Sequence, residues 1–322
     1  MKTEEIAFSG AGVQLTGSIT CPDSVSACPG VVLIGGSGPS DRHNDGFFDA
    51  LRTHLASAGV AVLAYDKRGA GTSGGAWATA TVDDLAHDAA AALAALQAHP
   101  GVAAGAVGVL GHSEGGWVAL RLCARLGAPR HLILNSCPAV SFAESEVSAL
   151  TGAGADPDAA AALLEQLIAA TRAGRDHHEG QRIIAAYQHE PWYPLLSAGG
   201  FTLDSNTWAQ LTAWGDYDPG DDLARLKTPT LAIFGENDPL VPVRASVERY
   251  QQTAARTARV RQTIVFPNAD HRLQVTAGFA PGYLTRLGTW CHEQGSPGSA
   301  GGTAAVEEGG ERGEDQQDGD GP

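Results

Sequence analysis

The feature that most constrains the fold is a five-residue turn at residues 111–115, Gly-His-Ser-Glu-Gly. Residues 107–110 (Val-Gly-Val-Leu) predict a short buried strand before this turn, and residues 117–122 (Trp-Val-Ala-Leu-Arg-Leu) predict the opening of a helix after it. In a sharp strand-to-helix turn, a Cβ at either glycine would collide with a neighbouring element. The pattern is typical of a nucleophile elbow, which holds the hydroxyl of its serine, here Ser113, in open space.

Apolar runs alternate with helical patterns along most of the chain. Residues 5–8 and 13–19 predict a β-hairpin around a glycine-rich turn. Further strands are expected at residues 31–34, 60–64, 107–110, 131–134, 229–234 and 262–266, with helices at residues 47–58 and 82–96. Strands that alternate with helices predict a mostly parallel sheet, whose functional loops leave the carboxyl ends of the strands.

The alternation stops at residues 140–218, where no convincing strand is found. Asp156 and Pro157 are typical of a helix start, and the apolar stripe that follows ends at Gly174. We therefore expect a helical cap inserted at residues 140–218, with residues 1–139 and 219–293 forming the core. Six aromatic residues cluster within it: Trp192, Tyr193, Phe201, Trp208, Trp214 and Tyr217. They either pack the cap or line an apolar acyl pocket, and because the cap leaves and re-enters the sheet at its carboxyl edge, we expect it to set substrate preference.

Composition narrows the class of protein. The chain has 322 residues, 43% of them hydrophobic, and contains no apolar run near 20 residues, which predicts a globular protein without a membrane span. The N-terminus has no apolar segment typical of a secretory signal. Five cysteines, an odd number without metal-ligand spacing, favour reduced structural thiols and a cytoplasmic location.

The net charge of −15 is concentrated towards the C-terminus. Residues 301–322 contain seven acidic residues and one arginine, so they carry six of these negative charges. Residues 294–322 are rich in Gly, Ser, Ala, Glu and Asp, and we expect a disordered acidic tail. No basic patch is found, so binding to nucleic acid or to an anionic membrane is not expected. The oligomeric state is not predicted.

A serine nucleophile needs a base to accept its proton and a carboxylate to orient that base. His271 follows the last predicted strand, and Asp238 follows the strand before it. The chain order Ser113, Asp238, His271 is the order found in α/β-hydrolases. Other carboxylates compete for the role of acid, namely Asp216, Asp218 and Glu236, and Asp238 is preferred because its loop directly follows a strand. The histidines His112, His177, His178 and His292 are interpreted as structural or exposed.

Two backbone N–H groups are needed to bind the oxyanion of such a reaction. The N–H of Glu114, directly after the serine, is one candidate. The other is expected in the glycine-rich loop at residues 35–39, where Ser37 is preferred and Gly36 is the alternative. This loop lacks the glycine and lysine spacing of a phosphate-binding loop.

With these motifs together, the chain resembles the α/β-hydrolase superfamily, in the bacterial esterase group that also contains serine aminopeptidases. The similar motifs are Gly-Ser-Gly-Pro at 36–39 with Asp-Arg at 41–42, Tyr-Asp-Lys-Arg-Gly-Ala-Gly-Thr-Ser at 65–73, Gly-His-Ser-Glu-Gly-Gly at 111–116, and Gly-Glu-Asn-Asp at 235–238. The resemblance covers residues 5–292. Two departures are Gly35-Gly36 where members often have His-Gly, and His43-Asn44 where relatives commonly have an acidic pair. Asp66 and Arg68 are expected to hold their loop by ion pairs and hydrogen bonds.

The resemblance implies a serine hydrolase of carboxylic esters that forms an acyl-enzyme and needs neither a metal nor an organic cofactor. Its expected partner is a small-molecule ester or a short peptide. Three alternatives on the same triad stay open: an aminopeptidase-like peptidase, a thioesterase and an acyltransferase. The peptidase would need a carboxylate in the cap for the substrate ammonium, from Glu144, Glu146, Glu179 or Glu190. A non-catalytic binding protein of the same fold is the remote alternative.

Overall fold

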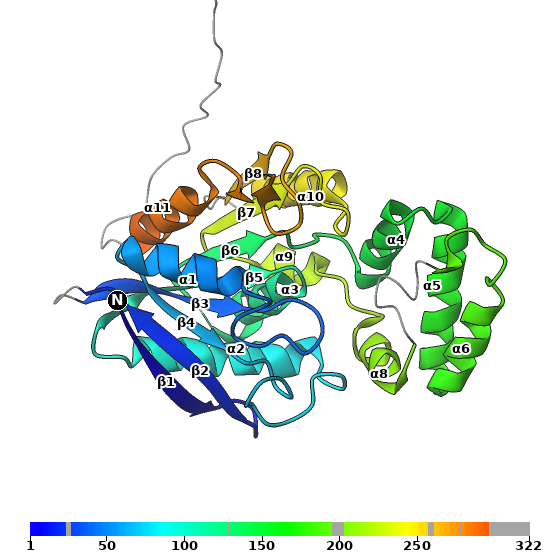
Figure 1. Cartoon of the computed structure of the whole chain (residues 1–322), viewed down its shortest axis with the longest axis horizontal. Helices are drawn as coiled ribbons and strands as arrows, with labels where there is room; N and C mark the ends of the chain where they lie inside the picture. Colours follow the sequence, from blue (N-terminus) through cyan, green and yellow to red (C-terminus); the bar gives the residue numbers. More distant parts are fainter. Residues whose placement is uncertain (24–26, 128, 195–202, 257–260, 277, 296–322) are drawn as a thin grey trace, which may run out of the picture.

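The computed structural model describes residues 1–23, 27–127, 129–194, 203–256, 261–276 and 278–295. Its centre is an eight-stranded sheet in the order β1-β2-β4-β3-β5-β6-β7-β8 (Figure 1). The strands are β1 (Lys2–Ser9), β2 (Gln14–Cys21), β3 (Cys28–Ile34), β4 (Ala61–Tyr65), β5 (Val102–His112), β6 (Leu132–Asn135), β7 (Thr230–Gly235) and β8 (Arg261–Phe266). β1 and β2 pair antiparallel as the predicted hairpin, β2 pairs antiparallel with β4, and the other pairs of this eight-stranded sheet are parallel. The predicted mostly parallel sheet is confirmed.

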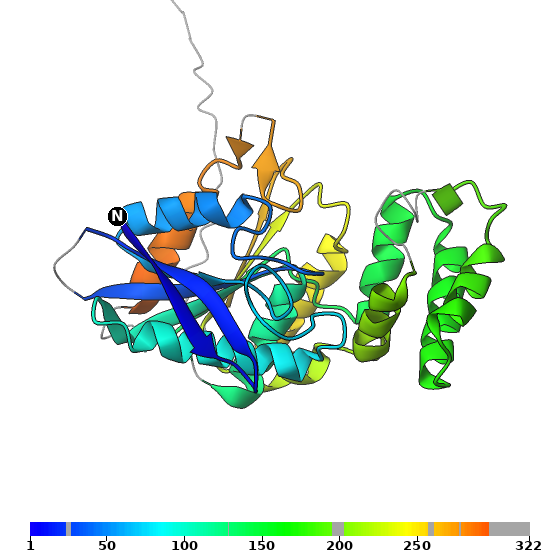
Figure 2. The same ribbon diagram turned by 60° about the horizontal axis from the view of Figure 1, so that its bottom comes forward.

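Helices cover both faces of the sheet (Figures 1 and 2). The helices of the core are α1 (Phe47–Ser57), α2 (Val82–Gln97), α3 (Glu114–Arg121), the π-helix η1 (Leu122–Leu126), α9 (Gly220–Arg225), α10 (Val243–Arg256) and α11 (Tyr283–Gly295). Along β3, Val32 packs in one core cluster with Leu85 of α2, whereas Val31 packs in another with Leu51 of α1. Both clusters are fully buried at β3, as the continuous apolar run predicts.

A helical insertion, α4 to α8, lies between β6 and β7 and stands beside the sheet in both views (Figures 1 and 2). It contains α4 (Phe142–Gly152), α5 (Pro157–Arg172), α6 (His177–Ala185) and α8 (Ser205–Trp214). Asp156 caps α5 as expected, through a hydrogen bond from Ala159 N. The Phe142 N–H donates to Tyr217 O at 2.9 Å, which joins the entry and exit of the insertion. The expected boundaries of 140–218 as a separate domain stay a prediction.

The remaining expectations on organisation have mixed outcomes. All five cysteines are free, as the reduced-thiol interpretation expects. Among the described helices, none is long and apolar enough to cross a membrane. The helix α11 extends to Gly295, one residue beyond the expected start of the tail, and the tail at 296–322 lies outside the described residues.

Candidate active site

Ser113 lies in the strained turn that the sequence predicts. Its backbone has φ 55° and ψ −125°, and the helix α3 begins at the next residue. A Cβ on Gly111 would lie 2.2 Å from Gly115 O, and a Cβ on Gly115 would lie 2.3 Å from Ile34 O. The Ser113 N–H donates to Asn135 O at 2.9 Å, which fixes the turn to β6. Only glycines fit at 111 and 115, so the two flanking elements hold Ser113 in this conformation.

Asp238 and His271 meet although 33 positions separate them in the sequence. They lie on the loops after β7 and β8, which are neighbouring parallel strands. His271 Nδ1 and Asp238 Oδ2 are 2.7 Å apart, and the Asp238 side chain is fully buried. The other carboxylate oxygen, Oδ1, accepts hydrogen bonds from the N–H groups of Leu240 and Val241. A carboxylate held in this way makes Nδ1 the donor, which leaves Nε2 of a neutral His271 free to accept a proton.

The ring of His271 lies against His112, the residue before Ser113, with centroids 4.9 Å apart. His112 is buried, and its Nδ1 accepts a hydrogen bond from Asn135 Nδ2, whose Oδ1 in turn accepts one from Tyr283. Burial and the nearby His271 lower the pKa of His112 well below its ordinary value, so its ring stays neutral. Within the described chain, no hydrogen bond joins Ser113 Oγ to His271; such bonds often tighten only when substrate is present.

The competing side chains have other partners. Asp216 pairs with Arg172, Asp218 pairs with Arg249, and Glu236 accepts a hydrogen bond from Asn268 N. His177 and His178 lie on the far helix α6, and His292 lies on α11 against Ala58 O. Asp238 is therefore the carboxylate that the fold brings to His271.

Gly36 lies beside Ser113, since a Cβ on Gly36 would be 3.4 Å from Ser113 Cβ. This brings the loop after β3, with Ser37, to the start of α3, where Glu114 is the first helical residue. The Lys67 ammonium donates to Gly36 O and lies 3.0 Å from Glu114 Oε1. The sequence interpretation assigned no role to Lys67, and its only signal was its place in the motif at residues 65–73.

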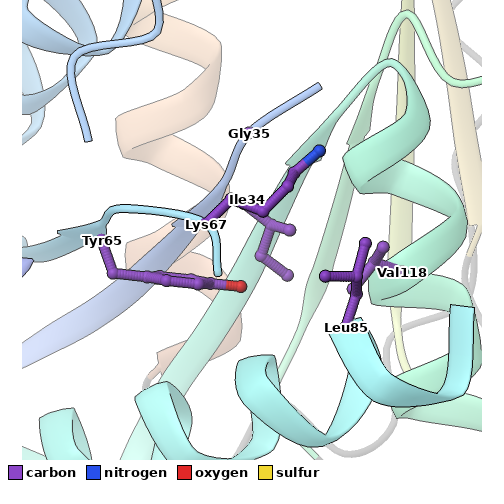
Figure 3. A pocket seen from close by; sticks show the side chains of 6 residues that line it. All are labelled: Ile34, Gly35, Tyr65, Lys67, Leu85 and Val118. Carbon is purple, nitrogen blue, oxygen red and sulfur yellow. The ribbon is translucent and has the colours of Figure 1, made fainter. Parts of the chain in front are cut away.

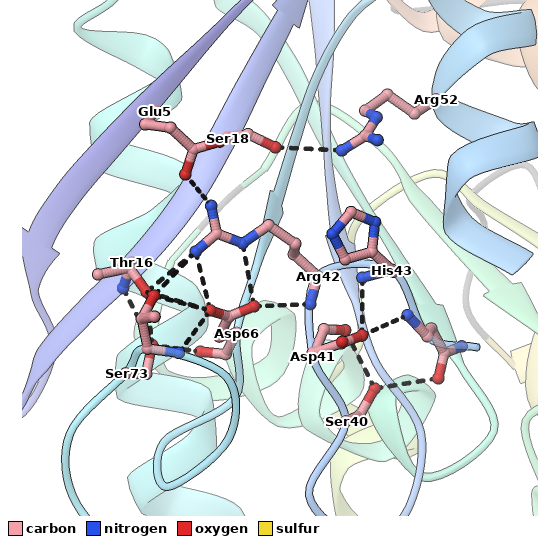
Figure 4. Close-up of polar contacts among 12 residues, drawn as sticks. Glu5, Thr16, Ser18, Ser40, Asp41, Arg42, His43, Arg52, Asp66 and Ser73 are labelled. Atoms are coloured by element: carbon pink, nitrogen blue, oxygen red, sulfur yellow. Dashed lines mark hydrogen bonds and ion pairs between the residues drawn. The ribbon is translucent and has the colours of Figure 1, made fainter. Parts of the chain in front are cut away.

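A second network, drawn in Figure 4, anchors the same loop after β3. Asp66 accepts hydrogen bonds from Arg42 N, Nε and Nη2 and from Thr72 N, at 2.8–3.0 Å. Burial alone would raise the pKa of Asp66, but these hydrogen bonds lower it well below its ordinary value. Arg68 forms a bidentate pair with the buried Asp88 of α2, at 2.6 and 2.8 Å. The predicted structural roles of Asp66 and Arg68 are confirmed.

Three tryptophans of the insertion are buried against protein. Trp192, Trp208 and Trp214 are 3%, 7% and 1% exposed. Trp214 stacks on Trp117 of α3 with ring centroids 6.1 Å apart, and its Nε1 donates to Ala80 O. Of the two open alternatives, these contacts favour packing for the three tryptophans; Phe201 lies outside the described residues.

Of the four cap glutamates considered for a substrate ammonium, Glu146 interacts electrostatically with Glu114, the residue after Ser113. Burial, together with the carboxylate of Glu114, raises the pKa of Glu146 to about 7. Glu144 instead caps α4 through Ser141, and Glu179 pairs with Arg182. In the part of the chain that the structure describes, no cluster of His, Cys, Asp or Glu is suited to hold a metal ion.

Comparison with known proteins identifies the family. The family described as serine aminopeptidase, S33, matches residues 42–275, which is more than half of the chain. The chain belongs to this family of α/β-hydrolases. The S33 family match spans the loop with Arg42, the elbow, and the loops that carry Asp238 and His271. A comparison with curated proteins finds no match.

Solved structures share the fold of this S33 family member. An esterase from Pyrococcus furiosus is 18% identical, with a TM-score of 0.63 and 92% of each chain covered. Est1E from Butyrivibrio proteoclasticus with bound ferulic acid is 18% identical, with a TM-score of 0.56, covering 89% of this chain and 96% of that one. A proline iminopeptidase from Mycobacterium smegmatis is 19% identical, with a TM-score of 0.58, covering 91% and 99%. Family and fold together make the protein a hydrolase.

Proposed function

We propose that this protein is a serine hydrolase that cleaves carboxylic esters through Ser113, His271 and Asp238. The observation that carries the proposal is the 2.7 Å contact between His271 Nδ1 and the buried Asp238, on the sheet edge that also presents the elbow. An imidazole oriented in this way on the same sheet edge as the partly exposed Ser113 is the arrangement that nucleophilic acyl transfer needs.

In the proposed mechanism, Ser113 Oγ attacks the ester carbonyl while His271 Nε2 accepts its proton. The tetrahedral oxyanion is held by the N–H groups of Glu114 and Ser37. His271 then returns the proton to the leaving alcohol, and an acyl-Ser113 intermediate forms. Water, deprotonated by His271, attacks the acyl carbon; the bond to Ser113 Oγ then breaks, His271 returns the proton to Oγ, and the acid is released. Asp238 keeps Nδ1 protonated and stabilises the imidazolium in both half-reactions.

The esterases among proteins of the same fold support an ester as the substrate. A second candidate, release of an N-terminal residue from a short peptide, has one observation in its favour. Glu146 interacts electrostatically with Glu114, the residue after Ser113, and because Glu114 is paired with Lys67, Glu146 is the carboxylate that would attract a substrate ammonium. Because the pKa of Glu146 in the free protein is about 7, its carboxylate becomes charged as the pH rises through 7, so kcat/KM for the peptide would rise between pH 6 and 8.

Labelling with a fluorophosphonate tests the nucleophile. We expect one adduct, on Ser113, and a loss of turnover of about 10⁶-fold in Ser113→Ala with an unchanged melting temperature. An adduct on another serine would overturn the assignment. A series of p-nitrophenyl esters and of aminoacyl-anilides with a free or an acetylated amino group then separates the two candidates. The peptidase requires turnover of the free-amino anilides that acetylation abolishes, whereas the esterase cleaves the esters and neither form of the anilides.

A further inference from the structure

Lys67 is a buried cation between the two loops that form the proposed oxyanion hole. It follows β4, its side chain is 8% exposed, and it pairs with the 4% exposed carboxylate of Glu114. Its neighbours in sequence serve other partners, because Asp66 binds Arg42 and Arg68 binds Asp88. A buried charge is costly unless it is paired and hydrogen-bonded, and both acceptors of Lys67 lie beside Ser113.

The first acceptor is the carbonyl oxygen of Gly36. This carbonyl and the N–H of Ser37 belong to one peptide group, which is planar and trans, so the two bonds point in opposite directions. An ammonium fixed on the carbonyl therefore sets the direction of the Ser37 N–H. Hydrogen bonds in series also polarise one another, which strengthens this N–H as a donor. Within the described residues no protein group accepts a hydrogen bond from the Ser37 N–H, so this N–H is available to a substrate.

The second acceptor is Glu114, whose own N–H is the other proposed oxyanion donor. Its Oε1 binds Lys67 at 3.0 Å, and its Oε2 accepts a hydrogen bond from Gln210 Nε2 of α8 at 2.8 Å. One ammonium thus connects both donor segments, and Glu114 extends the connection to the helical insertion.

The surroundings of Lys67 restrict it to this position. Figure 3 shows its side chain beside a small pocket, with its nitrogen away from the Tyr65 ring. The other side chains that line this pocket are apolar: Ile34, Leu85 and Val118. The hydrogen bonds to Gly36 and Glu114 therefore set the place of the ammonium.

We propose that Lys67 is a positioning residue of the oxyanion hole, which orients the Ser37 and Glu114 N–H groups towards the tetrahedral intermediate. This inference rests on the proposed function of Ser113. It predicts that Lys67 acts on the transition state and not on the binding of the ground-state ester.

The test is Lys67→Met in the full chain, assayed with p-nitrophenyl butyrate and with an alkyl trifluoromethyl ketone, whose hemiketal oxyanion mimics the intermediate. Loss of one oxyanion donor costs about 10²–10³ in kcat, and we expect a misaligned donor to cost about 10–100-fold. KM should change less than about threefold, and the inhibition constant of the ketone should rise by the same factor as kcat falls.

Lys67→Met also leaves the buried carboxylate of Glu114 without a counter-ion, with only its hydrogen bond from Gln210, which lowers stability. The double variant Lys67→Met/Glu114→Gln removes this charge, and we expect it to fold while keeping the loss in kcat. Arg121→Met is the matched control, because it breaks a buried pair with Asp222 at the far end of α3. It should lower the melting temperature but leave kcat and ketone inhibition unchanged.

Wild-type kcat and ketone inhibition in the double variant would overturn the inference, as would a loss in kcat no larger than that of Arg121→Met. Fluorophosphonate labelling of the wild-type protein distinguishes a failure of the proposed function from a failure of the proposed role of Lys67. Failure to label Ser113 refutes the proposed function itself, whereas labelled wild type with a fully active double variant refutes only the role of Lys67.

Discussion

His131 gives this protein a pH-dependent stability that is independent of the active site. The residue precedes β6, is completely buried, and neither ring nitrogen has a hydrogen-bond partner within the described chain. Its ring lies directly on Gly108 of β5, where an added Cβ would be 2.2 Å from Nε2. Burial, with a smaller contribution from Arg130, lowers the pKa of His131 from its ordinary 6.5 to about 3.

The sign and size of the effect follow from proton linkage. Between pH 6.5 and 3, the unfolded chain binds a proton at His131 that the folded protein excludes, so stability falls as the pH falls. From pH 8 to pH 5 the loss is about 2 kcal/mol, which for a chain of this size is a decrease of about 3 °C in melting temperature. His112, whose pKa is lowered as well, adds a loss in the same direction.

The assay is the melting temperature and the urea midpoint at pH 8, 7, 6 and 5 for wild type and His131→Leu. We expect the variant to lose about 2 kcal/mol less than wild type over this range. It should also be at least as stable at pH 8, because an unpartnered buried polar atom costs about 1–3 kcal/mol. His178→Leu, an exposed site on α6, is the control and should behave as wild type. A pH dependence in His131→Leu equal to that of wild type would refute the reasoning.

Two further predictions concern the site and its neighbour, the helical insertion. Asp238→Asn should keep the hydrogen bonds from the N–H groups of Leu240 and Val241 but present an amide to His271. We therefore expect kcat to fall by about 10⁴-fold with little loss of stability. An equal fall in kcat in the control Asp216→Asn would contradict the assignment of Asp238. Trp214→Ala removes a fully buried ring and should cost about 3–5 kcal/mol of unfolding free energy, or about 6 °C, with an unchanged acyl-length profile for p-nitrophenyl esters. A shifted profile at unchanged melting temperature would instead make Trp214 part of the acyl pocket.

Much of the core could be predicted because its signals are local. The apolar run at 31–34 predicts a strand buried on both faces, and β3 is such a strand. The glycines at 111 and 115 predict the elbow, since no other residue fits either position. Other elements lacked a clear local signal: β9 (Gln274–Val275) and β10 (Gly278–Phe279) are too short to show a period. The helix α4 has only a capping box, Ser141 with Glu144, to indicate its start.

The sequence by itself determined the elbow, the alternation of strands and helices, and the placement of Asp238 and His271 on loops after strands. Only the tertiary structure decided which carboxylate meets His271, because that contact depends on β7 and β8 being neighbours in the sheet. The tertiary structure also decided that the tryptophans of the insertion pack against protein. It brings Lys67 to Gly36 and to Glu114, which is 47 positions further along the chain than Lys67. The spacing of apolar residues and the steric need for glycine depend on residues that are close in the sequence, so the sequence alone reveals them. The partner of a buried charge depends instead on the order of the strands and on which loops the sheet brings to one edge.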